Sequence, residues 1–223
     1  MRTRYFGHDA AYQMRRASGA TGWDTPEVSA AVLRQFERLL RHDAVPQASR
    51  LIEFGCGAGN LSVGFARLGF EVLGVDISPS AVAWARERVS ALGLAIDFRV
   101  GNVVSLADDD SSYAVAVDSH CLHCLIGTDR GVFLRNTKRL LNPSGALIVN
   151  TMCQNGNTHR LEGFDATTGV IVHSGIATRY IGCRGGIESE IRQAGFEIVE
   201  SGVESDEEQM DDLLVVAIPI REA

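Results

Sequence analysis

The segment Leu51–Ser62 reads LIEFGCGAGNLS, in which a short apolar run leads into three closely spaced glycines. The run is typical of a strand that is buried on both faces of a parallel sheet. Bare backbone directly after such a strand lets a ligand approach the N–H groups of the loop and the start of the next helix. The segment therefore predicts a strand, a ligand-binding turn and a helix.

Two acidic residues indicate what this turn binds. Asp76 ends the next apolar run, FEVLGVD, at about the distance of 20 residues where an acid accepts hydrogen bonds from ribose hydroxyls. The loop has the spacing G-x-G-x-G, whereas dinucleotide-binding loops have G-x-G-x-x-G, and Asn60 stands where their third glycine would fall. Glu53, two positions before the first glycine, would repel a pyrophosphate. A ligand with a ribose and a positive charge fits better.

Strands and helices alternate along most of the chain. Helical patterns begin at Thr25, Asn60, Ser78 and Thr128. Alternation of this kind predicts an α/β, doubly wound parallel sheet with helices on both faces. Two apolar runs near the C-terminus, FEIVESG and LLVVAIPI, have only an acidic loop around Asp206 to Asp212 between them, so they are expected to pair antiparallel. The other predicted strands are 50–54, 70–76, 95–100, 113–118 and 146–150.

Composition limits the class of protein. The chain has 223 residues, enough for a single domain, and a formal net charge of −7 with scattered basic residues, which disfavours nucleic-acid and membrane partners. No signal peptide and no apolar run of about 18 residues is found, so a cytoplasmic location is expected. Five cysteines without an export signal predict free thiols. We expect a monomer or homodimer that acts on a small molecule.

Five stretches, in order, resemble the motifs of class I S-adenosylmethionine-dependent methyltransferases. They are EFGCGAG, VDIS, GNVVSL, VDSHCLHCL and LLNPSGALIV. The resemblance runs from about Trp23 to the C-terminus. It implies a Rossmann-like sheet of seven strands in the order 3-2-1-4-5-7-6 with the last strand antiparallel, S-adenosyl-L-methionine as cofactor, and methyl transfer to a small-molecule acceptor with an N, O or S nucleophile.

The resemblance also implies which residues bind the cofactor. The glycines of the loop would approach its amino acid and ribose parts, with Cys56 between them, and Glu53 would face its cationic group. The family often has Asp where Asn102 stands, but Asn can still hydrogen-bond the adenine amino group. The implied cofactor residues are Trp23, Glu53, Gly55, Cys56, Gly57, Gly59, Asp76, Ile77, Asn102, Val103 and Asp118.

A narrower resemblance involves the stretch GWDTPEV and the pair Asp129-Arg130. Both are similar to small methyltransferases of the thiopurine, thiol/halide and tellurite-resistance kind. This similarity implies that Trp23 closes over the cofactor and that Arg130 lies near the acceptor. We expect residues 1–24 to be an N-terminal lid segment, or else a disordered leader, and residues 25–223 to be the methyltransferase domain. The polar, glycine-rich stretch at about 152–184 is expected to be an insertion over the site.

Catalytic candidates follow the predicted fourth strand. His120 is the best-placed general base if the acceptor must lose a proton, and His123 is expected half-buried on a helix surface. Cys and His residues in the run His120–Cys124 are too closely spaced to converge on one ion, so no metal is expected. The proposed catalytic residues are His120, Asp118 and Arg130, and the proposed substrate-binding residues are Tyr5, His120, Arg130, Arg179 and Tyr180.

Two other functions stay open at this point. A nicotinamide-dependent oxidoreductase would share the overall fold, but the glycine spacing opposes it. A non-catalytic S-adenosylmethionine-binding partner or regulatory protein would keep the glycine loop and lose the acceptor pocket.

Overall fold

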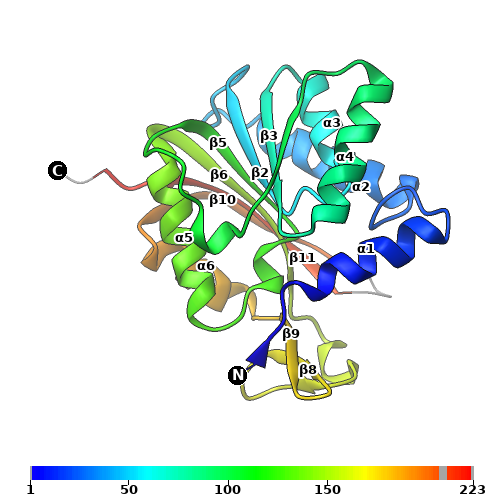
Figure 1. Cartoon of the computed structure of the whole chain (residues 1–223). Helices are drawn as coiled ribbons and strands as arrows, with labels where there is room; N and C mark the ends of the chain where they lie inside the picture. Colours follow the sequence, from blue (N-terminus) through cyan, green and yellow to red (C-terminus); the bar gives the residue numbers. More distant parts are fainter. Residues whose placement is uncertain (1, 206–209, 222–223) are drawn as a thin grey trace.

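The computed structural model describes residues 2–205 and 210–221. A large sheet with the strand order β10-β11-β6-β5-β2-β3-β4 runs through the molecule, and helices cover both of its faces (Figure 1). The strands are β2 (Arg50–Phe54), β3 (Glu71–Asp76), β4 (Asp97–Val100), β5 (Tyr113–Ser119), β6 (Leu141–Cys153), β10 (Phe196–Glu204) and β11 (Asp211–Pro219).

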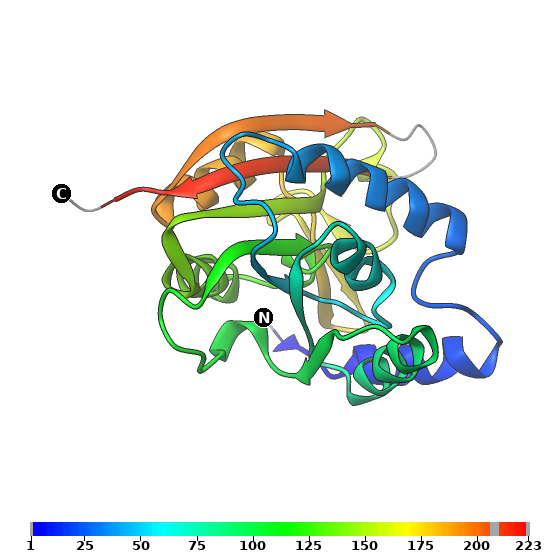
Figure 2. The same ribbon diagram turned by 90° about the horizontal axis from the view of Figure 1, so that it is seen from above.

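The strand labels of the large sheet are not consecutive, because four short strands of the chain, β1, β7, β8 and β9, form a second sheet. Counted in chain order within the large sheet alone, from β2 as the first, the strands lie in the order 3-2-1-4-5-7-6. β2 to β6 are parallel, and β11 is antiparallel to both β10 and β6. Figure 2 shows β10 in orange and β11 in red side by side along one edge. The predicted α/β class and the antiparallel last strand are confirmed.

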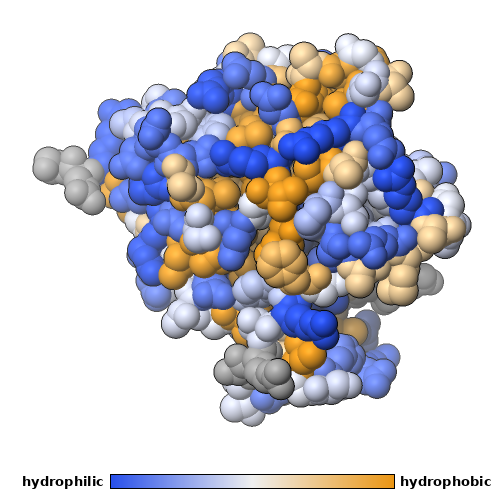
Figure 3. Space-filling view, viewed as in Figure 1, coloured by the Kyte–Doolittle hydropathy of each residue, from blue (hydrophilic) through white to orange (hydrophobic). Residues whose placement is uncertain are grey.

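Two hydrophobic layers hold the helices to the sheet. Helices α2 (Pro26–Leu40), α3 (Asn60–Arg67) and α4 (Pro79–Leu92) pack on one face around Phe36 and Phe65. Helices α5 (Thr128–Leu140) and α6 (Arg184–Gln193) pack on the other around Phe133 and Phe196. Figure 3 shows hydrophilic residues over α1 and α5, and hydrophobic residues gathered in the middle of the face between them.

Local sequence signals set where the helices begin. Thr25 accepts a hydrogen bond from the backbone N–H of Val28, and Pro26 occupies the first helical position of α2. Ser78 does the same for α4, where its hydroxyl accepts from Ala81 N at 3.0 Å. Both caps satisfy an N–H that the first turn of a helix would otherwise leave without a partner.

The N-terminal segment is structured and lies beside the insertion. It forms β1 (Arg2–Thr3) and helix α1 (Gly7–Ala17), and β1 pairs in parallel with β9 (Ile176–Tyr180). β7 (Phe164–Asp165) and β8 (Val170–His173) complete this small sheet, which lies with α1 on one side of the large sheet (Figure 1). The short 3₁₀ turns are η1 (Val103–Ser105), η2 (Leu122–Cys124) and η3 (Thr158–Arg160).

Helix α1 is docked on α4 by a carboxylate. Asp9 accepts hydrogen bonds from the Ser78 hydroxyl at 2.7 Å and from Ser80 N at 2.9 Å, at the N-terminal end of α4. A carboxylate is favourable there because the N-terminus of a helix has a partial positive charge. An ordered helix replaces the disordered leader that the sequence left open; its role as a lid stays a prediction.

Two predictions from the sequence concern the acidic loop and membrane-spanning helices. Residues 206–209 of the expected acidic loop lie outside it. Across 2–205 and 210–221, no helix combines the length and the apolar character needed to span a membrane.

Candidate active site

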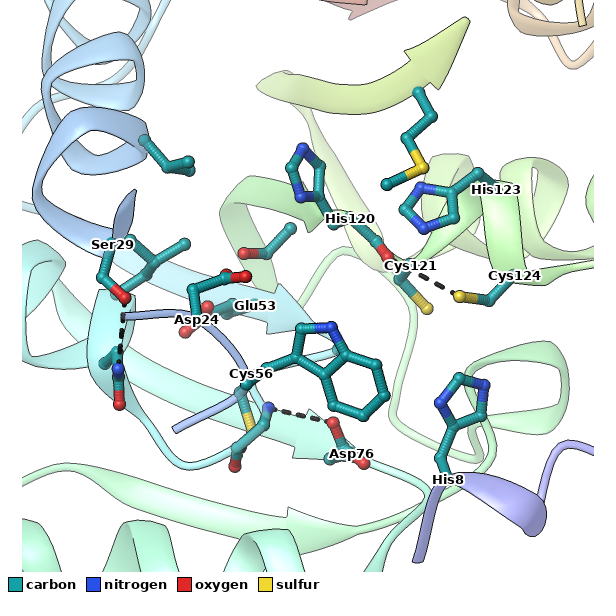
Figure 4. Close-up of a pocket in the computed structure, with 18 of the residues that line it drawn as sticks. His8, Asp24, Ser29, Glu53, Cys56, Asp76, His120, Cys121, His123 and Cys124 are labelled. Atoms are coloured by element: carbon teal, nitrogen blue, oxygen red, sulfur yellow. Dashed lines mark hydrogen bonds between the residues drawn. The ribbon is translucent and has the colours of Figure 1, made fainter. Parts of the chain in front are cut away.

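A cavity of about 640 Å³ opens where the parallel strands of the large sheet end. This volume falls within the range of about 300–1,000 Å³ that is typical of small-molecule sites. Its walls come from the loops that follow β2, β3, β4 and β5, together with α1, α2 and the small sheet (Figure 4). The predicted site residues that line it are Tyr5, Trp23, Glu53, Gly55, Cys56, Gly57, Asp76, Ile77, Asn102, Val103, His120 and Arg179.

The glycine loop is tight, and only glycine fits it without strain. Gly55, Gly57 and Gly59 have φ angles of 74°, 53° and 74°, in the left-handed region. A Cβ on Gly57 would collide with the hydroxyl of Tyr12 from α1, and one on Gly59 would lie 2.9 Å from the ring of Phe98. Gly59 itself is absent from the cavity lining, and its bare backbone lets the loop pack on Phe98 of β4 and Ala85 of α4; its predicted cofactor contact stays a prediction.

Two buried carboxylates flank this loop. Glu53 accepts a hydrogen bond from the Ser62 hydroxyl, and burial raises the pKa of its carboxyl to about 7. Asp76 accepts from Gly57 N at 2.9 Å and from Ser78 N at 2.8 Å, and burial raises its pKa as well. Burial penalises the charged form of both groups, so a cation or a set of hydroxyl donors at this end of the cavity would stabilise them.

Residues that follow β3 and β4 form an apolar slot beside Asp76. Ile77 and Val103 line it, and Asn102 stands at its edge. The Oδ1 atom of Asn102 accepts from Val104 N at 3.0 Å and keeps a second lone pair for a ligand donor. Trp23 lies across from them, with its ring centroid 5.3 Å from that of Tyr12.

Cys56 lies within the glycine loop and lines the cavity as a buried thiol. Burial raises its pKa well above the usual value, so the thiol stays protonated and unreactive at neutral pH. The thiols of Cys121 and Cys124 line the same cavity, and burial raises their pKa values too.

His120 is held in one orientation at the end of β5. Its backbone has a φ of 56°, and its N–H donates to Asn150 O at 3.1 Å. Its Nε2 lies 2.8 Å from Asn150 Oδ1 and 3.2 Å from Asp212 Oδ1. Two oxygen acceptors at Nε2 favour the tautomer with the proton there, which leaves the lone pair on Nδ1.

The environment of His120 also favours its protonated form. Burial lowers the pKa of the imidazole, but the contacts with Asp212 and Asn150 outweigh burial, so the pKa is raised. The Asn150 side chain is itself fixed, because its Nδ2 donates to Gln35 Oε1 at 2.8 Å. Sequence analysis missed Asp212, Asn150 and Gln35. A buried Asn at the end of an otherwise apolar strand was the one signal available for Asn150.

His123 lies deeper than expected. It is 3% exposed on the turn η2, rather than half-buried on a helix, and its Nδ1 has no hydrogen-bond partner. Burial lowers its pKa well below the usual value, so the ring is neutral at neutral pH. The ring centroids of His120 and His123 are 5.6 Å apart. Within 2–205 and 210–221, no three His, Cys, Asp or Glu residues converge closely enough to hold a metal ion.

Asp118, which was predicted at the mouth of the methyl-transfer site, does not line the cavity. The residue is fully buried, and its Oδ1 accepts from Cys121 N at 3.1 Å and from Leu122 N at 2.8 Å. Burial raises the pKa of its carboxyl to about 7. Asp118 therefore holds the turn that places His120, and it makes no contact with the cavity.

Arg130 and Tyr180, which were predicted to contact the acceptor, do not line the cavity. Arg130 is 2% exposed; its guanidinium donates to Glu190 at 2.6 Å and to Leu122 O at 2.6 Å, and it lies 4.2 Å from the Tyr180 ring centroid. These three interactions tie α5 to α6, η2 and β9. The packing of α5 on α6 turns Arg130 into the protein.

Tyr5 and Arg179 do line the cavity. The Tyr5 hydroxyl donates to Asp129 Oδ2 at 2.7 Å and accepts from Ile126 N at 3.2 Å. Burial and this bond to Asp129 raise its pKa to about 12, so the phenol is a fixed neutral group. Its role, like that of Arg179, stays a prediction.

Part of the chain is similar in sequence to known methyltransferases. Residues 51–145 match a family described as a methyltransferase domain. The ubiquinone biosynthesis O-methyltransferase of Azorhizobium caulinodans is 33% identical over 103 residues, which are 46% of this chain and 40% of that protein. The protein of the same name from Bradyrhizobium diazoefficiens is 33% identical over 131 residues, 59% of this chain and 51% of that protein. The chain thus spans about half the length of these curated relatives.

Solved structures share the fold over a longer stretch. The 1,6-didemethyltoxoflavin-N1-methyltransferase of Burkholderia thailandensis superposes with a TM-score of 0.73 at 19% identity, over 99% of this chain and 93% of that one. An S-adenosylmethionine-dependent methyltransferase from Methanosarcina mazei gives a TM-score of 0.72 at 22% identity, over 81% and 97%. The chain therefore contains a methyltransferase domain and has the fold of S-adenosylmethionine-dependent methyltransferases.

The cavity of this methyltransferase fits the family's cofactor, S-adenosylmethionine. Gly57 lines the cavity, and its bare backbone lets Tyr12 of α1 pack closely over the loop. A cationic ligand would stabilise the charged form of the buried Glu53 carboxyl, and Asp76 supplies acceptors for hydroxyls. The donor set therefore matches a ribose with a positive charge, and the nicotinamide alternative has no support.

The narrower, thiopurine-like branch of the methyltransferases stays a prediction. The relatives given above bear other names. Arg130, one of the two residues that suggested this branch, lies outside the cavity. Trp23, the other, lines it as expected.

Proposed function

We propose that this methyltransferase transfers a methyl group from S-adenosylmethionine to a hydroxyl oxygen of a small molecule, with His120 as general base. The observation that carries the proposal is the fixed imidazole of His120. Its Nε2 is held by Asn150 and Asp212, while its Nδ1 keeps a lone pair. The residue lines the same cavity as the glycine loop.

The chain's own residues have two tasks in such a reaction. S-adenosylmethionine supplies an activated methyl group on a sulfonium. Glu53, Asp76 and the glycine loop orient it, and α1 with Trp23 covers this end of the cavity. As the oxygen–methyl bond forms and the methyl–sulfur bond breaks, the bonding pair stays on sulfur and the hydroxyl proton passes to Nδ1 of His120. Asp212 stabilises the imidazolium that results.

An oxygen acceptor agrees with the names of the curated relatives, which are O-methyltransferases. Those relatives are matched over about half of their length, so their name supports the proposal without fixing the acceptor. A neutral hydroxyl must lose its proton, and this gives the paired imidazole a task that a thiolate or a free amine would not need. A non-catalytic binding protein remains the alternative.

The test couples turnover to cofactor binding. Wild-type protein is incubated with S-adenosylmethionine and a panel of phenols and catechols, and release of S-adenosylhomocysteine is measured. We expect His120→Ala to lower kcat by about 10²–10⁴-fold, the usual contribution of a general base, with unchanged affinity for S-adenosylhomocysteine by calorimetry. His159→Ala, at an exposed position on η3, is the matched control.

Two results would contradict the proposal. Binding of S-adenosylhomocysteine without turnover of any hydroxyl acceptor would favour the non-catalytic alternative. Wild-type turnover by the His120→Ala protein would remove His120 as the base.

A further inference from the structure

Arg179 on β9 presents an unpaired guanidinium to the cavity. Its Nε is buried and has no hydrogen-bond partner, and within 2–205 and 210–221 no ion pair or hydrogen bond to Arg179 is found. Arg130 is different, because Glu190 and the Leu122 carbonyl engage its donors. An unpaired donor that is buried costs free energy unless a ligand supplies the acceptor.

The groups around Arg179 are neutral or basic. Its charge acts on His8, His123 and Cys124, and it lowers the pKa of each of these groups. His123 adds a second buried atom without a partner, Nδ1. Figure 4 shows His8, His123 and Cys124 on one side of the cavity, opposite Asp24 and Glu53. This side therefore combines a guanidinium with two imidazoles and no carboxylate among the residues that Arg179 affects.

We propose that Arg179, assisted by His123 and His8, binds a carboxylate on the acceptor, so that the substrate is a small hydroxylated carboxylic acid. This inference rests on the proposed function and adds the substrate class. A guanidinium matches a carboxylate because two parallel N–H donors meet its two oxygens. The Nδ1 atom of His123 can donate a further hydrogen bond once the ring takes the matching tautomer.

The spacing of the site suits a compact aromatic acid. The ring centroids of His120 and His123 are 5.6 Å apart, so one small molecule can contact both imidazoles. A hydroxyl at His120 and a carboxylate at His123 and Arg179 can therefore belong to one molecule. Trp23 packs against His8, with ring centroids 5.9 Å apart and the rings tilted by 48°, and offers an apolar wall to the cavity.

The cofactor's own carboxylate is the competing partner for Arg179. The residues that fit the cofactor, Glu53, Asp76 and the glycine loop, belong to the strand ends β2 and β3. Arg179 instead acts on residues of η2 and α1. This separation assigns Arg179 to the acceptor.

Calorimetry on the full chain, saturated with S-adenosylhomocysteine, tests the assignment. The probes are 3,4-dihydroxybenzoate and its methyl ester, in which an added methyl group removes the negative charge. We expect the acid to bind wild-type protein at least about tenfold more tightly, as one hydrogen bond between charged groups provides. Arg179→Gln should abolish this preference, Arg179→Lys should keep part of it, and Arg135→Gln, at an exposed position of α5, should leave it unchanged.

The same titrations separate this inference from the proposed function. Equal binding of acid and ester, or no binding of the acid at millimolar concentration, would overturn the carboxylate site while cofactor binding stands. Weaker binding of S-adenosylhomocysteine to Arg179→Gln would assign Arg179 to the cofactor and also overturn it. Failure of wild-type protein to bind S-adenosylhomocysteine would instead defeat the proposed function.

Discussion

Glu53 and Asp76 lie buried beside the glycine loop, whereas His8 and His123, on which the charge of Arg179 acts, lie on the other side of the cavity (Figure 4). The first group is acidic and comes from one continuous stretch of chain, Arg50 to Ser78, as a strand, a turn, a helix and a strand. The second is neutral or basic and comes from α1, η2 and β9, which are far apart in sequence.

This difference shows how the two ends of the cavity are built. The acidic end depends on local backbone geometry, and a short motif is enough to define it. The basic end depends on how three distant segments meet, so its residues can vary without disturbing the cofactor end. In our proposal this independence lets the acceptor change while the cofactor stays the same.

The largest effect is expected from closing the acidic end. Gly57→Val places a β-branched residue at a φ of 53° and puts its side chain against Tyr12, in the space over the loop. We expect no detectable binding of S-adenosylhomocysteine by calorimetry. Gly175→Val, at a φ of 75° in the turn between β8 and β9 with open space around it, carries similar strain without blocking the cavity.

Thermal unfolding is measured for both glycine variants, so that their cofactor binding is compared at a temperature where both are folded. Cofactor binding by Gly57→Val like that of Gly175→Val would show that the loop is a turn and no more.

A smaller effect is expected from removing one carboxylate of the same end. Asp76→Ala should weaken S-adenosylhomocysteine by roughly 10- to 150-fold, which corresponds to about 1.5–3 kcal/mol for hydrogen bonds to a charged acceptor. Asp76→Asn keeps one acceptor oxygen for the loop N–H groups and should lose less. Asp97→Ala is the matched control, because Asp97 is an acid at an exposed position of β4. This variant should bind S-adenosylhomocysteine as tightly as wild-type protein.

The smallest effect is expected for the pH dependence of His120, the proposed base between the acidic and the basic end of the cavity. The raised pKa of His120 means that kcat should fall as the pH drops through that pKa, because the protonated ring cannot accept a proton. Asp212→Asn removes a charge that favours the protonated ring, so the pKa of His120 should fall and the acid limb of the pH–kcat profile should move to lower pH.

Other acidic residues near His120 also bear on this pH profile, and one of them provides the control variant. Asp24 and Asp118 also interact with His120 and remain in the variant, so part of the upward pKa shift should persist. Asp211→Asn changes the adjacent residue of β11, whose carboxylate bonds Asn155 instead of His120, and should leave the limb in place. An unmoved limb in Asp212→Asn would separate Asp212 from the base.

The motif residues of the sequence gain different degrees of support from the fold. Gly55, Gly57 and Asp76 line the cavity as predicted, because consecutive residues of a β-turn-α unit have little freedom in where they point. Asp118 belongs to a motif of the same family, yet its side chain turns inward and holds Cys121 and Leu122. A residue at a strand end has two faces available, and the sequence did not show which one it takes.

The sequence by itself determined the alternation of strands and helices, the glycine loop and the acids beside it, because hydrophobic periodicity and tight turns are encoded over a few neighbouring residues. Only the tertiary structure decided that α1 packs over the loop, that Arg130 pairs with Glu190, and that Asp212 meets His120. Each of these contacts joins segments far apart in the chain, through the packing of helices or the register of β11 against β6, and no local pattern specifies such a meeting.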